Sequence, residues 1–321
     1  QIIAPMETLS LNKQILYVTG LPRAGSTLLC QLLGGHPSIY STGHSSPLSH
    51  VFNNLRTYMS DEPFFLSQLD VDFDLAYQRL LNAYRGFING WFAETSLPVV
   101  VDKNRAWLRM IETVSLLDPD FRMLVCIRDL RQVYGSIEAQ HHKTLLLDFP
   151  DHMPPHAAYE RADALFAKEG VIGGPLRSIE FLLQDAPHAL RERVGFVAFE
   201  ALVSDPQETM RLLYKWLELP MSQFDTQRLE VKPHESDSYY RWKYRHNTHT
   251  SIQPPVQHGI SPRIEQEIVK NFGWFFEHFY VNPKGAADER FINGGEEHRS
   301  VSQEVKPPLK PKANLLKKFT K

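Results

Sequence analysis

The sequence is poor in cysteine, in long hydrophobic runs and in net charge. It has 321 residues, 2 cysteines and a formal net charge of -2. Cys30 and Cys126 each lie in an apolar run where a small hydrophobic side chain would serve, so we expect a reducing compartment and no disulfide framework. A protein that coats duplex nucleic acid or an acidic membrane needs a large positive charge, which this chain lacks.

Hydrophobic runs are also short. None reaches the roughly 18 consecutive apolar residues that span a membrane, and the first residues lack the basic and apolar pattern of a secretory leader. We therefore expect a cytoplasmic protein with no membrane span and no nucleic-acid partner. The near-neutral total is an average, because residues 306–321 hold six lysines and no acid while the rest of the chain is acidic.

Short apolar runs alternate with helical patterns along the chain. The expected strands cover residues 15–19, 98–101, 121–127 and 194–199. The expected helices that follow or flank them cover residues 26–33, 107–117, 130–140, 206–217 and 261–276. This alternation is typical of a parallel sheet with helices on both faces, so we expect an α/β, P-loop-type three-layer fold.

Additional helical segments exceed what a minimal sheet needs. They cover residues 48–58, 73–94, 156–168 and 175–184. We expect them to form lids over the carboxyl ends of the strands, where open α/β sheets bind their ligands. Apolar periodicity stops after residue 282. The expected domain is therefore residues 15–282, with an N-terminal extension over 1–14 and a flexible basic tail over 283–321.

A glycine-rich loop follows the first expected strand. Residues 20–27 read Gly-Leu-Pro-Arg-Ala-Gly-Ser-Thr, which is the glycine spacing of a nucleotide-binding P-loop. Ser26 stands where ATP-binding P-loops carry a lysine, and this change weakens an ATP interpretation. A phosphate could still be cradled by the backbone N–H groups of Arg23, Ala24, Gly25, Ser26 and Thr27.

The loop resembles that of one known family. Its pattern over residues 20–28, Gly-x-Pro-Arg-x-Gly-Ser-Thr-Leu, is similar to the loop that holds the 5′-phosphosulfate in sulfotransferases using 3′-phosphoadenylyl sulfate (PAPS). Arg128 follows the expected strand over 121–127, and Ser136 comes eight residues later. The resemblance implies that Arg128 and Ser136 bind the 3′-phosphate, and a guanidinium suits a dianionic phosphate. The likeness spans residues 15–256 and is strongest to bacterial and tyrosylprotein-type sulfotransferases.

Two weaker matches lie farther along the chain. Residues 199–206 resemble the family's Tyr-Glu-x-Leu-Val segment, with Phe199 where tyrosine is common, so no hydroxyl contact is expected there. A buried strand end that leads into a helix over 206–217, with Asp205 as its N-cap, is an equally good interpretation. Residues 244–248 resemble a loop that closes over the cofactor, which implies Thr248 as a ligand contact.

Sulfuryl transfer needs a base on the acceptor hydroxyl and cations where negative charge develops. The resemblance implies His44 as the base, in the loop after the His36-Pro37 pair, with His36 in reserve and an exposed loop histidine as the alternative. Lys103, just beyond the expected strand over 98–101, would face the sulfuryl group together with Arg23. A solvated surface lysine is the alternative for Lys103.

Other interpretations of single features remain open. Arg128 and Asp129 could form a surface ion pair with Arg131. Metal binding could be suggested by the histidines at positions 141, 142, 152, 156, 246 and 249. No cysteine or His-Glu-x-x-His pattern accompanies them, and Pro154 and Pro155 interrupt one pair, so we expect no metal.

The sequence therefore predicts an enzyme, a PAPS-dependent sulfotransferase. It would move a sulfuryl group from PAPS to a hydroxyl acceptor by in-line displacement and release 3′-phosphoadenosine 5′-phosphate (PAP), without a metal. The acceptor could be a small molecule or a carrier-tethered chain. A P-loop kinase or NTPase and a non-catalytic PAP-binding scaffold are the alternatives.

Overall fold

A parallel β-sheet forms the centre of the protein. The computed structural model describes residues 7–146, 157–231, 248–281 and 291–292. The sheet has the strand order β2-β3-β1-β4-β5-β6, with every pair parallel. The strands are β1 (Gln14–Gly20), β2 (Ile39–Tyr40), β3 (Val99–Lys103), β4 (Arg122–Ile127), β5 (Val194–Ala198) and β6 (Phe291–Ile292).

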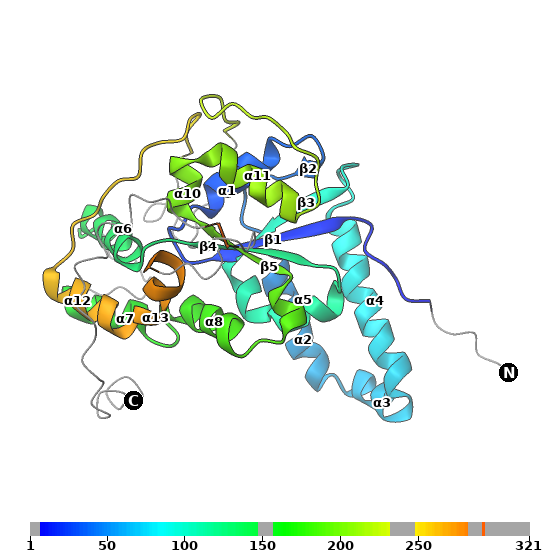
Figure 1. Cartoon of the computed structure of the whole chain (residues 1–321). Coiled ribbons are helices and arrows are strands. Elements are labelled where there is room, and N and C mark those ends of the chain that lie inside the picture. The colour runs from blue at the N-terminus through cyan, green and yellow to red at the C-terminus, as the bar shows by residue number, and fades with distance from the viewer. Residues whose placement is uncertain (1–6, 147–156, 232–247, 282–290, 293–321) are drawn as a thin grey trace.

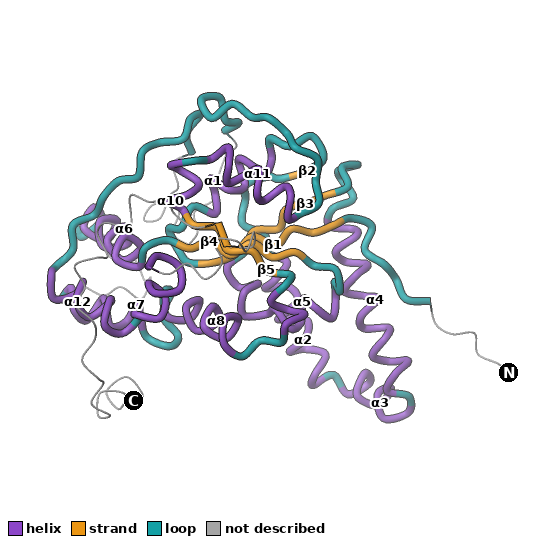
Figure 2. Tube along the Cα trace, in the orientation of Figure 1, coloured by secondary structure: helices purple, strands orange, loops and turns teal. Residues whose placement is uncertain are grey.

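Helices cover both faces of this sheet (Figure 1). The upper layer in that view contains α1 (Ser26–Gly34), α10 (Phe199–Ser204) and α11 (Pro206–Trp216). The lower side holds α2 (Leu48–Asp61), α4 (Phe73–Trp91), α5 (Ile111–Leu117) and α8 (Gly173–Gln184). Figure 2 shows the orange strands as a middle layer between purple helices. The predicted three-layer α/β fold is confirmed.

The other helices join the layers or gather at the end of the sheet to which β4 points. That end, on the left in Figure 1, holds α6 (Leu130–Lys143), α7 (Ala158–Phe166), α12 (Pro262–Asn271) and α13 (Gly273–Phe276). A π-helical turn, η2 (Glu277–Val281), follows α13. The connecting helices are α3 (Pro63–Val71), the 3-10 helix η1 (Arg105–Met110) and α9 (His188–Arg191).

The strands are buried because helices cover the sheet on both sides. β3 and β5 are buried over their whole length, and in β4 only the first residue, Arg122, is partly exposed. Such strands read as continuous apolar runs rather than as an alternation of apolar and polar residues. The runs in the sequence therefore identified β1, β3, β4 and β5, whereas the short strands β2 and β6 were not expected.

Several helices differ from the sequence-based expectations. Residues 63–71 form α3, which was not expected; the Glu62 side chain caps it by accepting the N–H of Phe65 at 2.6 Å. The helix expected over 107–117 begins as η1, and the helix expected over 261–276 is divided at Phe272. Phe199 starts α10 instead of ending β5.

The expectation of lids was wrong for three of the four additional segments. α2, α4 and α8 are structural helices of the lower side, because their apolar stripes pack into the main core. Only α7 lies near α6 at the end of the sheet to which the strands point. Within the expected tail, the structure describes residues 291 and 292, which pair with β5.

Candidate active site

The loop between β1 and α1 turns sharply against β4. A Cβ atom on Gly20 would lie 2.2 Å from the carbonyl oxygen of Cys126, so only glycine fits at this close approach. Arg23 and Gly25 have positive φ values of 58° and 83°. α1 then begins at Ser26 with no side chain capping its N-terminus. Its first backbone N–H groups therefore point out of the helix without a side-chain acceptor, as an anion-binding loop requires.

Lys103 lies beside this loop although it belongs to the neighbouring strand. β3 pairs with β1 in parallel, and Lys103 is opposite Val18. The lysine is only 5% exposed, and its Nζ donates a hydrogen bond to Thr27 Oγ1 at 3.3 Å. In the described part of the chain, no carboxylate lies within ion-pair distance of Nζ. A buried ammonium in this state favours an anionic ligand.

Arg128 and Ser136 meet Arg23 on the other side of β1. Arg23 Nε donates to Ser136 Oγ at 3.1 Å, and Arg128 Nη1 donates to the Arg23 carbonyl at 3.1 Å. Arg128 is 7% exposed, and its guanidinium carbon lies 4.4 Å from the centre of the Phe199 ring. Burial lowers the pKa of Arg128; nearby Arg23 lowers it further, and Glu200 opposes the shift.

The sequence left open a surface ion pair among Arg128, Asp129 and Arg131, and the structure shows only the pair between Asp129 and Arg131 in the described residues. Asp129 does pair with Arg131, at 2.5 Å between Oδ2 and Nη2, but Asp129 is buried rather than on the surface. Among the placed residues, Arg128 has no carboxylate within ion-pair distance. The hydrogen bonds of its guanidinium that are described go to the carbonyls of Arg23 and Val256, so no carboxylate neutralises its charge directly.

His44 lies in a loop that is fixed to Lys103. Ser45 forms a parallel bridge with Lys103, and the Ser46 N–H donates to the Lys103 carbonyl at 2.8 Å. Asn104 Nδ2 also donates to the Ser46 carbonyl at 2.6 Å. The partly buried His44 comes directly before this anchor. The loop thereby brings His44 to the same sheet edge as Lys103 and the phosphate-type loop.

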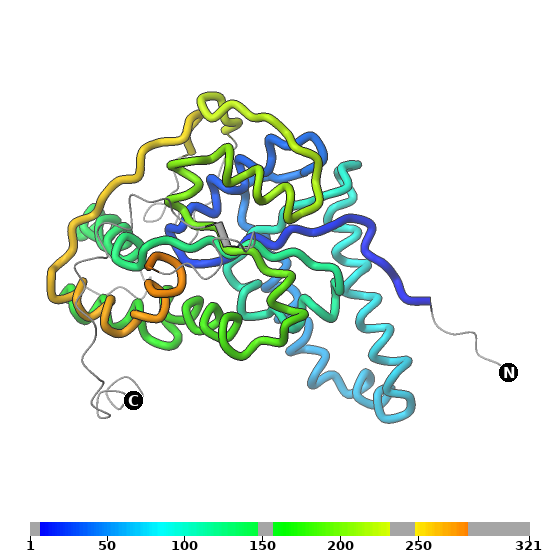
Figure 3. Tube along the Cα trace, viewed as in Figure 1, coloured from blue at the N-terminus to red at the C-terminus, as the bar shows by residue number. Residues whose placement is uncertain are grey.

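A segment near the C-terminus also reaches this region. Residues 248–261 run as a gold loop from the upper layer to α12 (Figure 3). The Val256 carbonyl accepts a hydrogen bond from Arg128 Nη2 at 3.4 Å. The His258 N–H donates to Gln132 Oε1 at 2.9 Å, and Gln132 Nε2 donates to the His258 carbonyl at 3.3 Å. We call residues 256–260 the strap.

Sequence reasoning missed the strap and its histidine. Burial lowers the pKa of His258, and Arg128, Arg23 and Lys143 lower it further. Three cationic side chains therefore disfavour protonation of this imidazole in addition to its burial. No periodicity or motif in residues 256–260 could have revealed this position, because it depends on contacts with residues over a hundred positions away.

Two predicted residues are found elsewhere. His36 is buried and uses both ring nitrogens: Nε2 donates to the Pro220 carbonyl at 2.9 Å, and Nδ1 accepts the Ser38 N–H at 3.1 Å. The reserve assignment of His36 as a base was therefore wrong. The residue next to Thr248, His249, accepts a hydrogen bond from Gln31 on α1 at 3.3 Å. Among the contacts of the described residues, none joins Thr248 itself to Arg128.

In the described parts of the chain, no group of three or more histidine, cysteine, aspartate or glutamate side chains is arranged to hold a metal ion. His152, His156 and His246 lie outside the described residues. No helix among those described has the length and apolar character needed to cross a bilayer.

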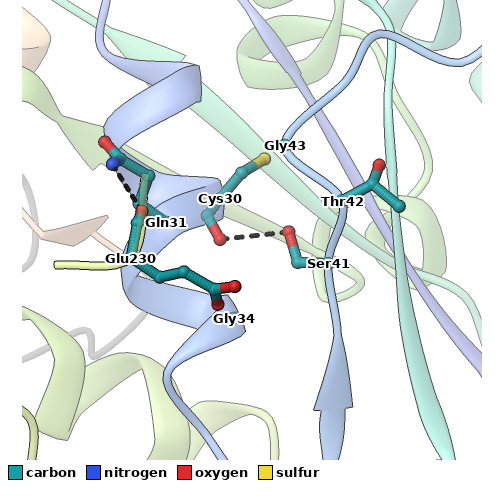
Figure 4. Close-up of a pocket in the computed structure, with 7 residues that line it drawn as sticks. All are labelled: Cys30, Gln31, Gly34, Ser41, Thr42, Gly43 and Glu230. Carbon is teal, nitrogen blue, oxygen red and sulfur yellow. Dashed lines mark hydrogen bonds between the residues drawn. The ribbon is translucent and has the colours of Figure 1, made fainter. Parts of the chain in front are cut away.

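A small hollow lies beside the site without being part of it. It encloses about 240 Å³, its open mouth included, between α1 and the segment over 41–43 (Figure 4). Ser41 Oγ donates to the Cys30 carbonyl at 3.0 Å, and Gln31 Nε2 donates to the Glu230 carbonyl at 3.0 Å. Neither Lys103 nor Arg128 lines this hollow, so we do not assign it to the anion.

The fold and the site define an α/β protein with a phosphate-type loop flanked by buried cations. The family described as the sulfotransferase family matches residues 16–223. The chain belongs to the sulfotransferase family, as its motifs indicated. No curated protein matches the chain.

Several solved structures are similar to the chain at low identity. The sulfotransferase domain from the curacin biosynthetic pathway is 18% identical, with a TM-score of 0.46, over 82% of this chain and 99% of that one. Sulfotransferase STF9 from Mycobacterium avium is 15% identical, with a TM-score of 0.44, over 85% and 78%. Retinol dehydratase in a complex with retinol and PAP is 12% identical, with a TM-score of 0.40, over 85% and 84%.

Proposed function

We propose that this chain transfers a sulfuryl group from PAPS to a hydroxyl acceptor and releases PAP. The observation that carries the proposal is a pair of buried cations: Lys103 at the end of β3 and Arg128 directly after the end of β4, the two strands that flank β1. Neither has a carboxylate partner within the described residues. Two separate cations suit a nucleotide that carries anionic groups at both its 5′ and 3′ positions.

The loop is proposed to hold the 5′-phosphosulfate. The contacts would come from the backbone N–H groups of Arg23, Ala24, Gly25, Ser26 and Thr27. Lys103, in contact with Thr27, would stabilise charge on the sulfuryl and leaving oxygens. Arg128 and Ser136 would bind the 3′-phosphate. The Arg23 side chain contacts Ser136, which supports a place for its guanidinium between these two anionic groups.

His44 is the proposed base. The acceptor oxygen would form a bond to sulfur while the bond from sulfur to the bridging phosphate oxygen breaks, and the hydroxyl proton would pass to the His44 imidazole. The anchor of Ser45 on Lys103 supports this role, because it ties the base to the strand that supplies the cation. A fixed spacing between base and cation favours the reacting geometry.

The wider assignments follow from the same proposal. Residues 15–282 would form the catalytic domain, with 1–14 as an extension and 283–321 as a basic tail. Thr248 stays a proposed ligand contact. Cys30 and Cys126 are buried and are not joined in a disulfide, which supports a reducing, cytoplasmic setting. The acceptor would be a small molecule or a carrier-tethered hydroxyl.

Calorimetry with PAP and with ATP·Mg²⁺ tests the proposal directly. We expect PAP to bind and ATP·Mg²⁺ to bind far more weakly. Arg128→Ala should weaken PAP much more than ATP, since ATP has no 3′-phosphate. Equal affinity for both ligands would favour a P-loop kinase or NTPase. PAP binding without PAPS turnover on a broad acceptor panel would favour a non-catalytic scaffold.

A further inference from the structure

A buried carboxylate lies behind Arg128 and has no part in the proposed chemistry. Glu200 is 7% exposed, and both of its oxygens are occupied. Oε1 accepts the backbone N–H of Asp129 at 3.1 Å, and Oε2 accepts the hydroxyl of Tyr280 at 3.2 Å. Tyr280 is itself buried. A carboxylate is costly to bury, and the two oxygens of this one are engaged by a backbone N–H and a tyrosine hydroxyl of the protein itself.

Phe199 and Glu200, the first two residues of α10, contact Arg128 and Asp129 in the turn between β4 and α6. Phe199 places its ring under the Arg128 guanidinium, and Glu200 holds the N–H of Asp129. The side chain of Arg128 and the peptide that follows it are therefore both fixed. The Phe199 ring also touches the loop, since a Cβ on Gly25 would lie 2.6 Å from Phe199 Cδ2.

α12 and η2, near the end of the described residues, are also linked to the turn after β4. The Asp129 carboxylate accepts hydrogen bonds from Nε and Nη2 of Arg131, and Arg131 Nη1 donates to Glu265 Oε1 of α12 at 3.1 Å. Tyr280, on η2, completes the contact through Glu200. α12 and η2 thus contact the start of α6 through two separate polar links.

We propose that Glu200 and Tyr280 are positioning residues, which hold the turn after β4 so that Arg128 meets the 3′-phosphate of the nucleotide. Neither residue would touch the ligand. The inference rests on the proposed function, because it assumes that Arg128 binds this phosphate. It assigns the helices beyond residue 261 to the cofactor site, although no motif of the site lies there.

The test compares two ligands that differ only in the 3′-phosphate, PAP and adenosine 5′-monophosphate (AMP). Their affinities are measured by calorimetry or competition on the full chain, for the original protein and for Tyr280→Phe and Glu200→Gln. We expect either variant to lose about threefold to tenfold in PAP affinity, as for one or two lost hydrogen bonds. AMP affinity should stay unchanged.

Tyr84→Phe is the matched control. Its hydroxyl is also buried and donates to the Phe52 carbonyl at 3.4 Å, but it lies on α4, away from the site. It should not change the ratio of PAP to AMP affinity. In an Arg128→Ala background, Tyr280→Phe should have no further effect on PAP, because its action passes through the arginine.

The outcomes separate the two proposals. If the original protein binds AMP as tightly as PAP, the proposed 3′-phosphate site fails, and the positioning role fails with it. If the original protein prefers PAP but both variants keep the full preference, only the positioning role is wrong. An equal loss for PAP and AMP would also overturn it, because this would indicate a general structural defect.

Discussion

The ammonium nitrogen of Lys103 lies 3.3 Å from the hydroxyl of Thr27, so the cation that the loop lacks at Ser26 is supplied by the adjacent strand. An ATP-binding P-loop carries this charge in the loop itself. Here the charged side chain is buried beside the sheet. The backbone of the same residue, Lys103, pairs with Ser45 and so anchors the His44 loop. The first prediction concerns this lysine.

Lys103→Met should separate charge from packing. Methionine keeps most of the length and the buried apolar stem but removes the ammonium group. We expect turnover of PAPS to fall by about 10²–10³-fold, as when one preorganised donor is removed from an active site. Thermal stability should not fall, because an unpaired buried charge is removed. Release of PAP and thermal unfolding are the measurements.

Lys215→Met, at an exposed position of α11, is the control for this variant. Comparable turnover in the two variants would contradict the assignment.

His44→Ala should affect chemistry and not nucleotide binding. We expect a loss of turnover of about 10²–10⁴-fold, which is the usual contribution of a positioned general base. PAP affinity should stay near that of the original protein, because the imidazole would act on the acceptor. Rate assays and calorimetry measure the two effects. The exposed His50 of α2 offers a matched control as His50→Ala. Normal turnover in His44→Ala would exclude His44 as the base.

Gly135→Ala should displace the strap. A Cβ at this position of α6 would lie 2.6 Å from His258 Cβ and 3.1 Å from Ile260 Cγ2. Replacing glycine by alanine within a helix normally stabilises it by roughly 0.5–1 kcal/mol. Here we expect that gain to be offset and PAP affinity to fall, since the strap contacts Arg128.

Gly86→Ala in α4 is the control for this substitution. Its Cβ would meet only Leu9, at an ordinary contact distance of 3.6 Å. It should raise the midpoint of thermal unfolding and leave PAP affinity unchanged. If both alanine variants bind PAP equally well, the strap does not contribute to the nucleotide site.

Asp118→Asn should change the pH dependence of stability. Burial raises the pKa of Asp118 to about 6; nearby Asp120 adds to the shift, and a hydrogen bond from Tyr17 opposes it. Between pH 4 and 6 the folded state therefore binds more protons than the unfolded state, and stability falls as the pH rises through this window. A shift of about two units corresponds to roughly 3 kcal/mol. The variant should be more stable than the original protein at pH 7.5 and not at pH 4. Thermal unfolding at both pH values measures this, and an equal difference at the two would contradict it.

Local signals in the sequence were enough to predict the four central strands of the sheet, the loop and one helix cap. The loop is recognisable because its glycines and Ser26–Thr27 are adjacent in sequence. Asp205 caps α11 as expected, accepting the Glu208 N–H at 3.2 Å. These features depend on residues a few positions apart, where pattern and structure are directly linked.

The features that were missed depend on distant contacts. The strap lacks apolar periodicity, and its position is set by Gln132 and Arg128. Phe199 was placed in β5 because no polar or glycine break separates it from the apolar strand. In the structure it turns into α10, where its ring lies beside Gly25 and Arg128. Tertiary packing, not local preference, decided these two positions.

Successive residues of β3 face opposite sides of the sheet. The Asp102 carboxylate accepts the indole N–H of Trp107 on one side, and Lys103 contacts Thr27 on the other. A slip of one residue against β1 would exchange them and present a carboxylate to the loop. The register of β3 against β1 therefore determines whether a positive or a negative side chain faces the loop. One residue inserted before Val99 that shifted this register would turn the proposed anion site into an anion-repelling one without any change in the loop.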